Sequence, residues 1–512
     1  MAHEPRSSWL NKDLGKFPGG IIYLPGQEEK LYEDSDMGPE FRQRRHFYYM
    51  SGADFPGCAV TYDIERDQLI LWIPYTDPRT VLWYGRTPSP KQCMAHSHVD
   101  DVRYIQGLQK TLIAAISSQR IIYCLHRDQV PPFEIPDNVS IDTSDLAPAI
   151  DRARVIKTEY EIEMIRRANA VSSAAHRVIM SRIKGLRNER QIDAVFHYSC
   201  HTSGAKRQAY PVIAASGING STLHYNDNDQ PLAGRQLVVL DAGAEWNCYA
   251  SDVTRTFPIS GQFSPQAAAI YRLVERMQVE CIERICPGMM FHSLHLHACA
   301  VAVIGLLELG ILRGGSPAKI LSHGTIAAFF PHGLGHHVGL EVHDVSGAER
   351  LLFDVPSRGA PVSPLRGDGL TGCRAGSKRA LYSADMLGSL YRDALHTGQM
   401  PMDASYLAKG GKAMRFGEVE DQTHSPMLAG KQKLEKGMVV TVEPGIYFCR
   451  EYLEQFLNHP VHSQFIDKFE LEKFYDVGGV RIEDDILVTE EGYENLTTAP
   501  KGEEMLKVIN KR

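Results

Sequence analysis

The stretch Pro331-His-Gly-Leu-Gly-His-His-Val-Gly-Leu-Glu-Val-His-Asp344 carries the strongest signal in this 512-residue chain. Its glycines allow close backbone approach and unusual dihedral angles. It places His332, His336 and His343 among few other polar residues, and histidines so grouped in a glycine-rich segment are rarely all structural. We therefore interpret the segment as part of a functional site. His337 merely follows His336, and we expect it to be structural or exposed.

Four acidic residues end or interrupt short apolar runs elsewhere in the chain. Asp241 closes Leu237-Val-Val-Leu-Asp241, and Asp252 follows in the next β-like run. We predict a hairpin turning at Trp246-Asn247 that pairs Asp241 directly with Asp252, with Cβ atoms ~5 Å apart. Unneutralised carboxylates at that distance repel each other, and a bound cation reverses this. Alternatively, both residues are solvated turn residues.

The other two acidic residues are Glu443 and Glu483. Glu443 ends Met438-Val-Val-Thr-Val-Glu443, and Glu483 lies in Gly478-Gly-Val-Arg-Ile-Glu-Asp-Asp485. Taken singly, each is as compatible with an exposed strand residue. Together with Asp241, Asp252 and His336 they form an oxygen-rich set that suits two divalent cations, and Mn²⁺ better than zinc. If the five converge, the protein is a metal-dependent hydrolase.

Composition narrows the class of protein. The length allows two or three domains, and 43% apolar and 23% charged residues are typical of a soluble globular protein. With a net charge of −7, nucleic acid is not an expected partner. The N-terminus lacks an apolar signal region and the ten cysteines are scattered, so we expect reduced thiols and a cytoplasmic protein. The apolar stretch 298–307 is short of the ~20 residues that span a bilayer, so no membrane is expected.

The order of patterns along the chain predicts two domains. Residues 1–155 show short β-rich segments and a helical pattern over 102–117, which indicates an α/β domain. A long helix should begin near Thr158, where Thr158 and Glu161 form a capping box. A second should begin at Ser264-Pro265, and a third should span about 292–309. We assign residues 156–512 to the second domain, with an irregular insertion at about 349–433.

Seven ordered motifs of the second domain resemble those of the proline-specific metallopeptidases, Xaa-Pro aminopeptidase and prolidase. The N-terminal segments Phe41-Arg-Gln43 and Phe47-Tyr-Tyr-Met-Ser-Gly-Ala-Asp-Phe-Pro-Gly57 resemble their N-terminal domain. The second-domain motifs are Thr222-Leu-His-Tyr225, Asp241-Ala-Gly-Ala244, Ser251-Asp-Val-Thr-Arg-Thr256, His332-Gly-Leu-Gly-His336, Val342-His-Asp344, Val442-Glu-Pro-Gly-Ile-Tyr447 and Val480-Arg-Ile-Glu-Asp-Asp485. The resemblance implies an α/β N-terminal domain followed by an α+β catalytic domain of the pita-bread fold, in peptidase family M24B.

The resemblance also implies roles for individual residues and two Mn²⁺ ions per subunit. Asp241 would chelate one ion, Asp252 and Glu483 would bridge both ions, and His336 and Glu443 would complete the other shell. The residues expected to act in catalysis or to face the substrate are His224, His332, His343, Glu443 and Arg481. The metals would activate a shared water, His343 would stabilise the oxyanion, and Glu443 would shuttle a proton to the proline nitrogen.

The expected substrates are peptides with proline at the second position, and we expect a homo-oligomer. An apolar slot near His224 would accept the proline ring. A dipeptidase must also recognise the free carboxylate of proline, usually with an arginine, and Arg481 is available for that. The motif Glu494-Asn-Leu-Thr497 favours an aminopeptidase over the dipeptidase alternative. Two other functions occur on the same fold. A non-catalytic binding protein would have lost metal ligands, and a creatinase-like hydrolase works without metals. The intact set of five candidate ligands argues against both.

The insertion between His343 and Glu443 is the main departure from the family pattern. It either caps the mouth of the cleft and restricts substrate length, or loops out as disordered surface. In the second case, deleting about 360–410 would leave folding and metal binding intact.

Overall fold

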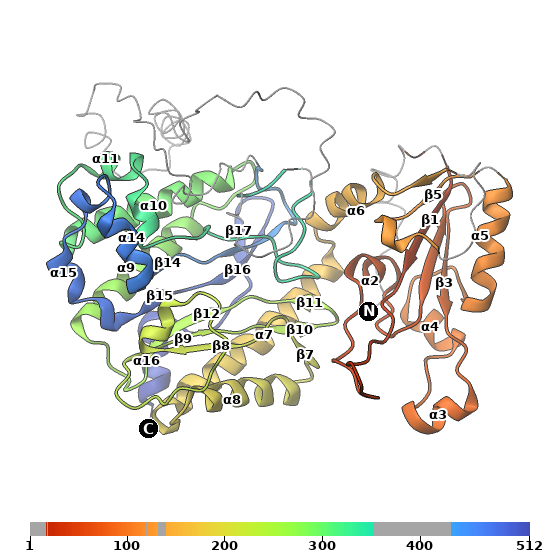
Figure 1. Ribbon diagram of the computed structural model, residues 1–512, viewed down its shortest axis with the longest axis horizontal. Helices are drawn as coiled ribbons and strands as arrows, with labels where there is room; N and C mark the ends of the chain where they lie inside the picture. Colours follow the sequence, from red (N-terminus) through yellow and green to blue (C-terminus); the bar gives the residue numbers. More distant parts are fainter. Residues whose placement is uncertain are drawn as a thin grey trace. The chain divides into compact units, whose positions relative to one another are not determined.

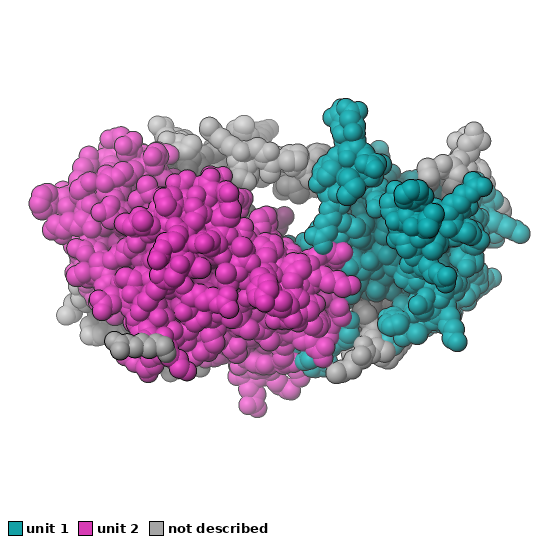
Figure 2. Space-filling view, turned by 90° about the horizontal axis from the view of Figure 1, so that it is seen from below, with its two compact units in different colours: residues 1–163, 339–348 teal, residues 164–338, 349–512 magenta. Residues whose placement is uncertain are grey.

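The computed structural model describes residues 17, 19–118, 120–131, 140–347, 349–352 and 432–511, which form two compact units (Figures 1 and 2). The first contains residues 1–163 and 339–348, and the second contains residues 164–338 and 349–512. We predicted the boundary at residue 155, but it falls inside the long helix. The predicted insertion, 349–433, lies almost entirely outside the described residues.

The first unit is built on a mixed six-stranded sheet of order β4-β3-β2-β1-β5-β6. Strand β2 pairs antiparallel with β1 and β3, whereas the outer pairs are parallel. The strands are β1 Ile21–Pro25, β2 Ala59–Asp63, β3 Gln68–Ile73, β4 Asp101–Tyr104, β5 Ile122–Tyr123 and β6 Ile141–Asp142. The helices are α2 Arg45–Ser51, α3 Pro78–Tyr84, α4 Pro90–His96, α5 Leu108–Ser117 and α6 Leu146–Val155.

Side chains that alternate between the two faces of the strands form the core of this unit. Ile70 and Trp72 of β3 point to the same side as Ile21 of β1, where Leu108 and Leu112 of α5 cover them. The helix predicted over 102–117 is wrong at its start, because residues 101–104 form β4. That segment pairs with β3 and buries Val102, so a sheet contact outweighs the local helical spacing.

The segment 339–348 belongs to the first unit although the chain reaches it from the second. The side chain of Asp344 is buried there between Arg154, 2.5 Å away, and Lys157, 3.2 Å away. Glu341 accepts hydrogen bonds from Arg42 and Arg45. These ion pairs explain why the sequence boundary does not capture the segment.

The described residues of the second unit form four small sheets of order β12-β9-β8, β13-β16-β17, β14-β15 and β11-β10-β7. Their strands are β7 Arg207–Gln208, β8 Ile213–Ser216, β9 Leu237–Asp241, β10 Ala244–Trp246, β11 Tyr249–Ala250, β12 Thr254–Pro258, β13 Val439–Val442, β14 Gly445–Tyr447, β15 Gly479–Arg481, β16 Asp484–Val488 and β17 Tyr493–Asn495. Isolated bridges, Thr254 to Glu483 and His337 to Val440, connect the sheets.

Helices pack on these sheets, α8 on β8 and α9 on β13 to β15 (Figure 1). The helices are α7 Glu159–Arg182, α8 Glu189–Thr202, α9 Pro265–Ile282, α10 Phe291–Glu308, α11 Pro317–Ser322, α14 Arg450–Asn458, α15 Lys468–Glu472 and α16 Gly502–Asn510. The predicted starts are confirmed: Thr158 and Glu161 form the capping box of α7, and the Ser264 side chain caps α9.

Helix α10 is long and apolar enough, by length and composition, to cross a membrane. However, 67% of that window is buried inside the protein, and α10 packs along α9. Such burial is typical of a core helix.

Candidate metal centre

The turn after β9 brings Asp241 and Asp252 to one place. Asp241 ends β9, and its backbone pairs with Thr254 of β12. The predicted direct pairing with Asp252 is therefore wrong. The hairpin tip forms at Asn247 and Cys248, both with positive φ, and Asp252 lies in the irregular stretch between β11 and β12. The carboxylates still converge because this stretch folds back over the end of β9.

His336 and Glu443 come together because residues 334–338 run beside β13. The backbone of Thr441 donates to the carbonyl of His336 (2.8 Å), and that of Glu443 donates to the carbonyl of Leu334 (2.8 Å). A Cβ on Gly335 would lie 2.1 Å from the Thr441 carbonyl oxygen, so only glycine permits this approach.

Glu483 is held between the sheets by Thr254. Its backbone N–H donates to the Thr254 carbonyl (3.1 Å), and its Oε2 accepts a hydrogen bond from the Thr254 hydroxyl (2.6 Å). The residue is 1% exposed. Its other oxygen, Oε1, is buried and has no hydrogen-bond partner among the described residues. A buried carboxylate oxygen left in this way needs a cation or a proton.

The five predicted ligands form two overlapping clusters, and Glu483 belongs to both. Asp241, Asp252 and Glu483 each offer an atom within 4.8 Å of the others, as do His336, Glu443 and Glu483. His336 Nε2 lies 3.4 Å from Asp252 Oδ2 and 3.5 Å from Glu443 Oε1. The structure thus brings together all five residues, although they are far apart in sequence.

Burial and mutual repulsion raise the pKa values of the carboxyls. Burial, with the nearby charge of Asp252, raises the pKa of Glu443 to about 7. The pKa of Glu483 is well above its usual value for the same two reasons. Burial lowers the pKa of His336, but its hydrogen bond to Asp252 and the charge of Glu443 outweigh this and raise it to about 9. Such a site favours protons or cations.

His336 is oriented as a ligand would be. Its Nδ1 lies 3.0 Å from the carbonyl oxygen of His337. A carbonyl only accepts, so Nδ1 carries the proton there and Nε2 faces Asp252 and Glu443. This is the common arrangement for histidines that bind metals, in which a hydrogen bond on one nitrogen orients the other.

Arg481 extends from β15 toward Asp241. Its Nη2 donates to Asp241 Oδ2 (2.6 Å), its Nη1 to the Tyr447 hydroxyl (2.9 Å), and its Nε to the Thr254 hydroxyl (3.3 Å). The side chain is buried. Arg481 is therefore occupied in orienting Asp241 and Tyr447, and is not placed to receive a substrate carboxylate.

His332 continues this network. Its Nε2 lies 2.8 Å from the Tyr447 hydroxyl and its Nδ1 lies 2.7 Å from the Gly333 carbonyl oxygen. Since Arg481 donates to Tyr447, the Tyr447 proton points to Nε2, and Nδ1 carries the ring proton. Burial, together with the charge of Arg481, lowers the pKa of His332 to about 3, so the ring is neutral.

The two remaining predicted residues differ in placement. His224 is exposed, follows the short helix η4 (Gly217–Ser221), and is close enough to His332 for its charge to lower that pKa. His343 is exposed and lies in the segment that packs with the first unit. Its role in catalysis stays a prediction.

Sequence reasoning missed several residues that support the ligands. Tyr210 donates to Asp241 Oδ1 (2.7 Å). Asp485 Oδ2 accepts from the backbone of Asp252 (2.9 Å) and from Asn169 of α7 (2.7 Å). Tyr447 and Asp485 lie inside quoted motifs and could have been singled out there. Tyr210 and Asn169 carry no local signal, because only the fold brings them to the site.

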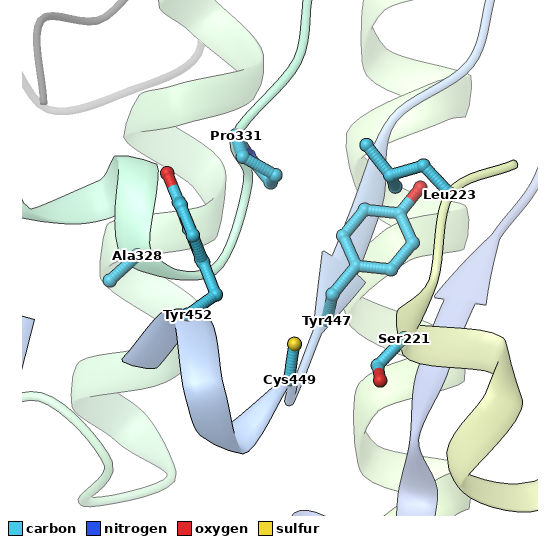
Figure 3. Close-up of a pocket in the computed structure, with 7 residues that line it drawn as sticks. All are labelled: Ser221, Leu223, Ala328, Pro331, Tyr447, Cys449 and Tyr452. Atoms are coloured by element: carbon cyan, nitrogen blue, oxygen red, sulfur yellow. The ribbon is translucent and has the colours of Figure 1, made fainter. Parts of the chain in front are cut away.

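An apolar cavity of about 240 Å³ lies against Tyr447, whose hydroxyl is bonded to His332, and against Leu223, the residue before His224. The rings of Tyr447 and Tyr452 stand on either side of it (Figure 3). It is lined by Ser221, Leu223, Ala328, Pro331, Tyr447, Cys449 and Tyr452. Drug-sized ligands need roughly 300–1,000 Å³, so this cavity suits a smaller apolar group.

Comparison with known proteins agrees with this geometry. Residues 163–363 and 411–490 match metallopeptidase family M24, and residues 5–123 match the aminopeptidase P N-terminal domain. The chain is similar to probable Xaa-Pro aminopeptidases of Colletotrichum graminicola (52% identity, covering 96% of this chain and 88% of the relative) and Chaetomium globosum (53%, covering 97% and 84%). It also resembles the structure of aminopeptidase PepP of Pseudomonas aeruginosa (26% identity, TM-score 0.71, covering 99% of both chains). The predicted family and fold class are confirmed, and the chain belongs to metallopeptidase family M24.

Proposed function

We propose that this chain is an Xaa-Pro aminopeptidase with two Mn²⁺ ions held by Asp241, Asp252, His336, Glu443 and Glu483. The observation that carries the proposal is Glu483, shared by two ligand clusters, with one buried oxygen that no described residue satisfies. Four carboxylates and one imidazole match the preference of Mn²⁺ for oxygen-rich sites. The names of the closely related chains support the substrate class.

When bound, the ions would supply Lewis acidity and make water a nucleophile near neutral pH. The protein contributes proton transfer and orientation. Glu443, which lies with His336 and Glu483 in one of the two clusters, would take a proton from the attacking water and pass it to the proline nitrogen. Neutral His332 is fixed in one tautomer by Tyr447 and Gly333, with Nδ1 3.8 Å from Glu443 Oε2.

Selectivity for proline has a steric basis in this proposal. The nitrogen of the Xaa-Pro bond carries no hydrogen. An enzyme that binds this peptide bond therefore gains affinity from contacts with the proline ring instead of from an N–H donor. The cavity between Tyr447 and Tyr452 is apolar, and its lining includes Leu223, the residue before His224. We assign the pyrrolidine ring to this cavity.

The position of Arg481 favours an aminopeptidase over a dipeptidase. Its guanidinium nitrogens are engaged by Asp241, Tyr447 and Thr254, so it is unavailable for the carboxylate of a dipeptide. The test is to compare the rates of the manganese-loaded enzyme on Xaa-Pro-Yaa tripeptides and Xaa-Pro dipeptides. Faster cleavage of the tripeptides is expected, and faster cleavage of the dipeptides would show a prolidase.

We further propose a cytoplasmic homo-oligomer. The location rests on the sequence alone. Self-association is supported by α3, where Leu82, Trp83 and Tyr84 are 82%, 78% and 77% exposed, since adjacent apolar side chains so exposed often mark an interface. Light scattering of the full chain tests this: Leu82→Asp with Trp83→Asp should lower the mass, and an unchanged mass would rule out α3 as the interface.

A further inference from the structure

A single buried carboxylate organises the loop that carries His224. Glu189, at the start of α8, is fully buried. Its Oε1 accepts hydrogen bonds from the backbone and hydroxyl of Ser216 (2.8 and 2.6 Å) and from Asn219 Nδ2 (3.0 Å). Its Oε2 accepts from the Tyr225 hydroxyl (2.8 Å) and the Gln230 backbone (3.0 Å). The beginning, middle and end of the loop 216–230 thus depend on one side chain.

Two features favour a carboxylate at this position. Glu189 occupies the first turn of α8, where the helix dipole stabilises negative charge. Five donors satisfy both oxygens, as a buried charge requires. Burial and the bond to Glu189 raise the pKa of Tyr225, so its hydroxyl remains a donor. Arg235 Nη1 also lies 3.9 Å from Oε1, so the carboxylate, its five donors and this arginine form one network.

The opposite side of the loop rests on the strand that leads to the metal centre. A Cβ on Gly479 would lie 2.1 Å from the Gly220 carbonyl oxygen, and a Cβ on Gly478 would lie 2.0 Å from that of Gly217. The loop backbone therefore lies directly on the residues that precede Arg481. Glu189 holds the loop from one side and β15 supports it from the other.

His224 itself depends on this backbone. Among the described residues, no hydrogen bond holds its ring, whereas the neighbouring Tyr225 is bonded to Glu189 and packs on Ile213, Ala215 and Val239. We propose that Glu189 is a positioning residue for the peptidase reaction, and that it acts through Tyr225 to hold His224 beside the proline cavity. The inference rests on the proposed function, in which His224 faces the substrate.

Tyr225→Phe isolates the bond next to His224 without removing the carboxylate. In the full-length, manganese-loaded enzyme we expect kcat/KM for a tripeptide such as Ala-Pro-Ala to fall about tenfold, the effect of one hydrogen bond to a charged group. The change should divide between kcat and KM as it does for His224→Ala. In the His224→Ala background, Tyr225→Phe should cause no further loss.

Ser216→Ala is the matched control, because it removes a bond to the same carboxylate from the strand side. It should lower thermal stability about as much as Tyr225→Phe and leave kcat/KM and metal content unchanged. Glu189→Gln should lower both thermal stability and kcat/KM. Tyr225→Phe with wild-type kinetics, or with a loss that adds fully to that of His224→Ala, would overturn the inference.

Two other results separate this inference from the proposed function. Unchanged kinetics of His224→Ala in an active enzyme would overturn the positioning role and leave the peptidase assignment intact. A metal-loaded wild-type enzyme that cleaves no Xaa-Pro bond would refute the proposed function itself.

Discussion

Glu483 shows why the residues proposed as ligands would need a cation. One oxygen is bonded to Thr254, and the other is buried without a partner among the described residues. An unsatisfied buried polar group costs ~1–3 kcal/mol, and more when charged. Asp252 and Glu443 lie close enough to raise the pKa further. Bound divalent cations would both satisfy the free oxygen of Glu483 and offset the repulsion between the carboxylates.

Asp252 lies close to both Glu483 and His336, where the two candidate ion sites adjoin. Its removal should therefore affect the binding of both ions. We expect Asp252→Ala to lower kcat/KM by more than ~100-fold, since changing even a residue that only supports a ligand typically costs 10–100-fold. Manganese bound per chain, measured by mass spectrometry, should fall in parallel. Asp476→Asn, at an exposed acidic residue of the same unit, is the control. Undiminished turnover in Asp252→Ala would remove this residue from the site.

Tyr447 connects Arg481 to His332 through one hydroxyl. Tyr447→Phe keeps the ring against the proline cavity but removes the hydrogen bond to His332 Nε2, so the His332 ring is oriented only by its bond to the Gly333 carbonyl. We expect kcat to fall ~10–100-fold with a smaller change in KM. Steady-state kinetics with Tyr198→Phe, an exposed tyrosine, as the control test this. A change confined to KM would show that the hydroxyl serves binding only.

The proposed ligands lie at or just beyond strand ends, and backbone contacts between elements determine how these ends meet. Asp241 ends β9, Glu443 follows β13, and Glu483 lies between β15 and β16. Close contacts at glycines hold these elements together, as at Gly335 against Thr441. The positions of the proposed ligands therefore depend on glycines that are not themselves ligands.

Gly479 on β15 offers a test of this dependence. An added methyl would meet the Gly220 carbonyl oxygen at 2.1 Å and Tyr447 Cδ1 at 2.8 Å. Gly479→Ala should separate β15 from η4, reduce kcat/KM at least ~10-fold, and lower thermal stability. Gly185→Ala, where a Cβ meets nothing within 4 Å, should change neither. Wild-type activity of Gly479→Ala would show that the contact can relax without moving the site.

At the scale of the whole molecule, the centre couples metal binding to the stability of the second unit. Burial raises the pKa of Glu443 to about 7 and that of Asp485 to about 8, against 4.5 and 3.8 ordinarily. A raised carboxyl pKa stabilises the folded state below the unfolded value, and this contribution is lost as pH rises through the folded value. The metal-free protein should therefore lose stability from these groups between about pH 4 and 8.

Cations compete with those protons, so their stabilising effect should grow with pH. We expect the increase in Tm caused by saturating manganese to be larger at pH 8 than at pH 6. Thermal unfolding of chelator-treated and manganese-loaded protein measures it, with Asp252→Ala expected to show little increase at either pH. An equal or smaller increase at pH 8 would contradict the linkage.

The sequence by itself determined the family and indicated the five residues proposed as ligands, because each motif carries a local signature: an acid after an apolar run, or histidines among glycines. It also located the starts of α7 and α9, since caps are local interactions. The hairpin register was wrong, because the positive-φ turn at Asn247 and Cys248 and the pairing with Thr254 follow from sheet contacts. Tyr210, Asn169 and Glu189 were missed for the same reason. Their hydrogen bonds join residues distant in sequence, and only the folded chain brings such partners within reach.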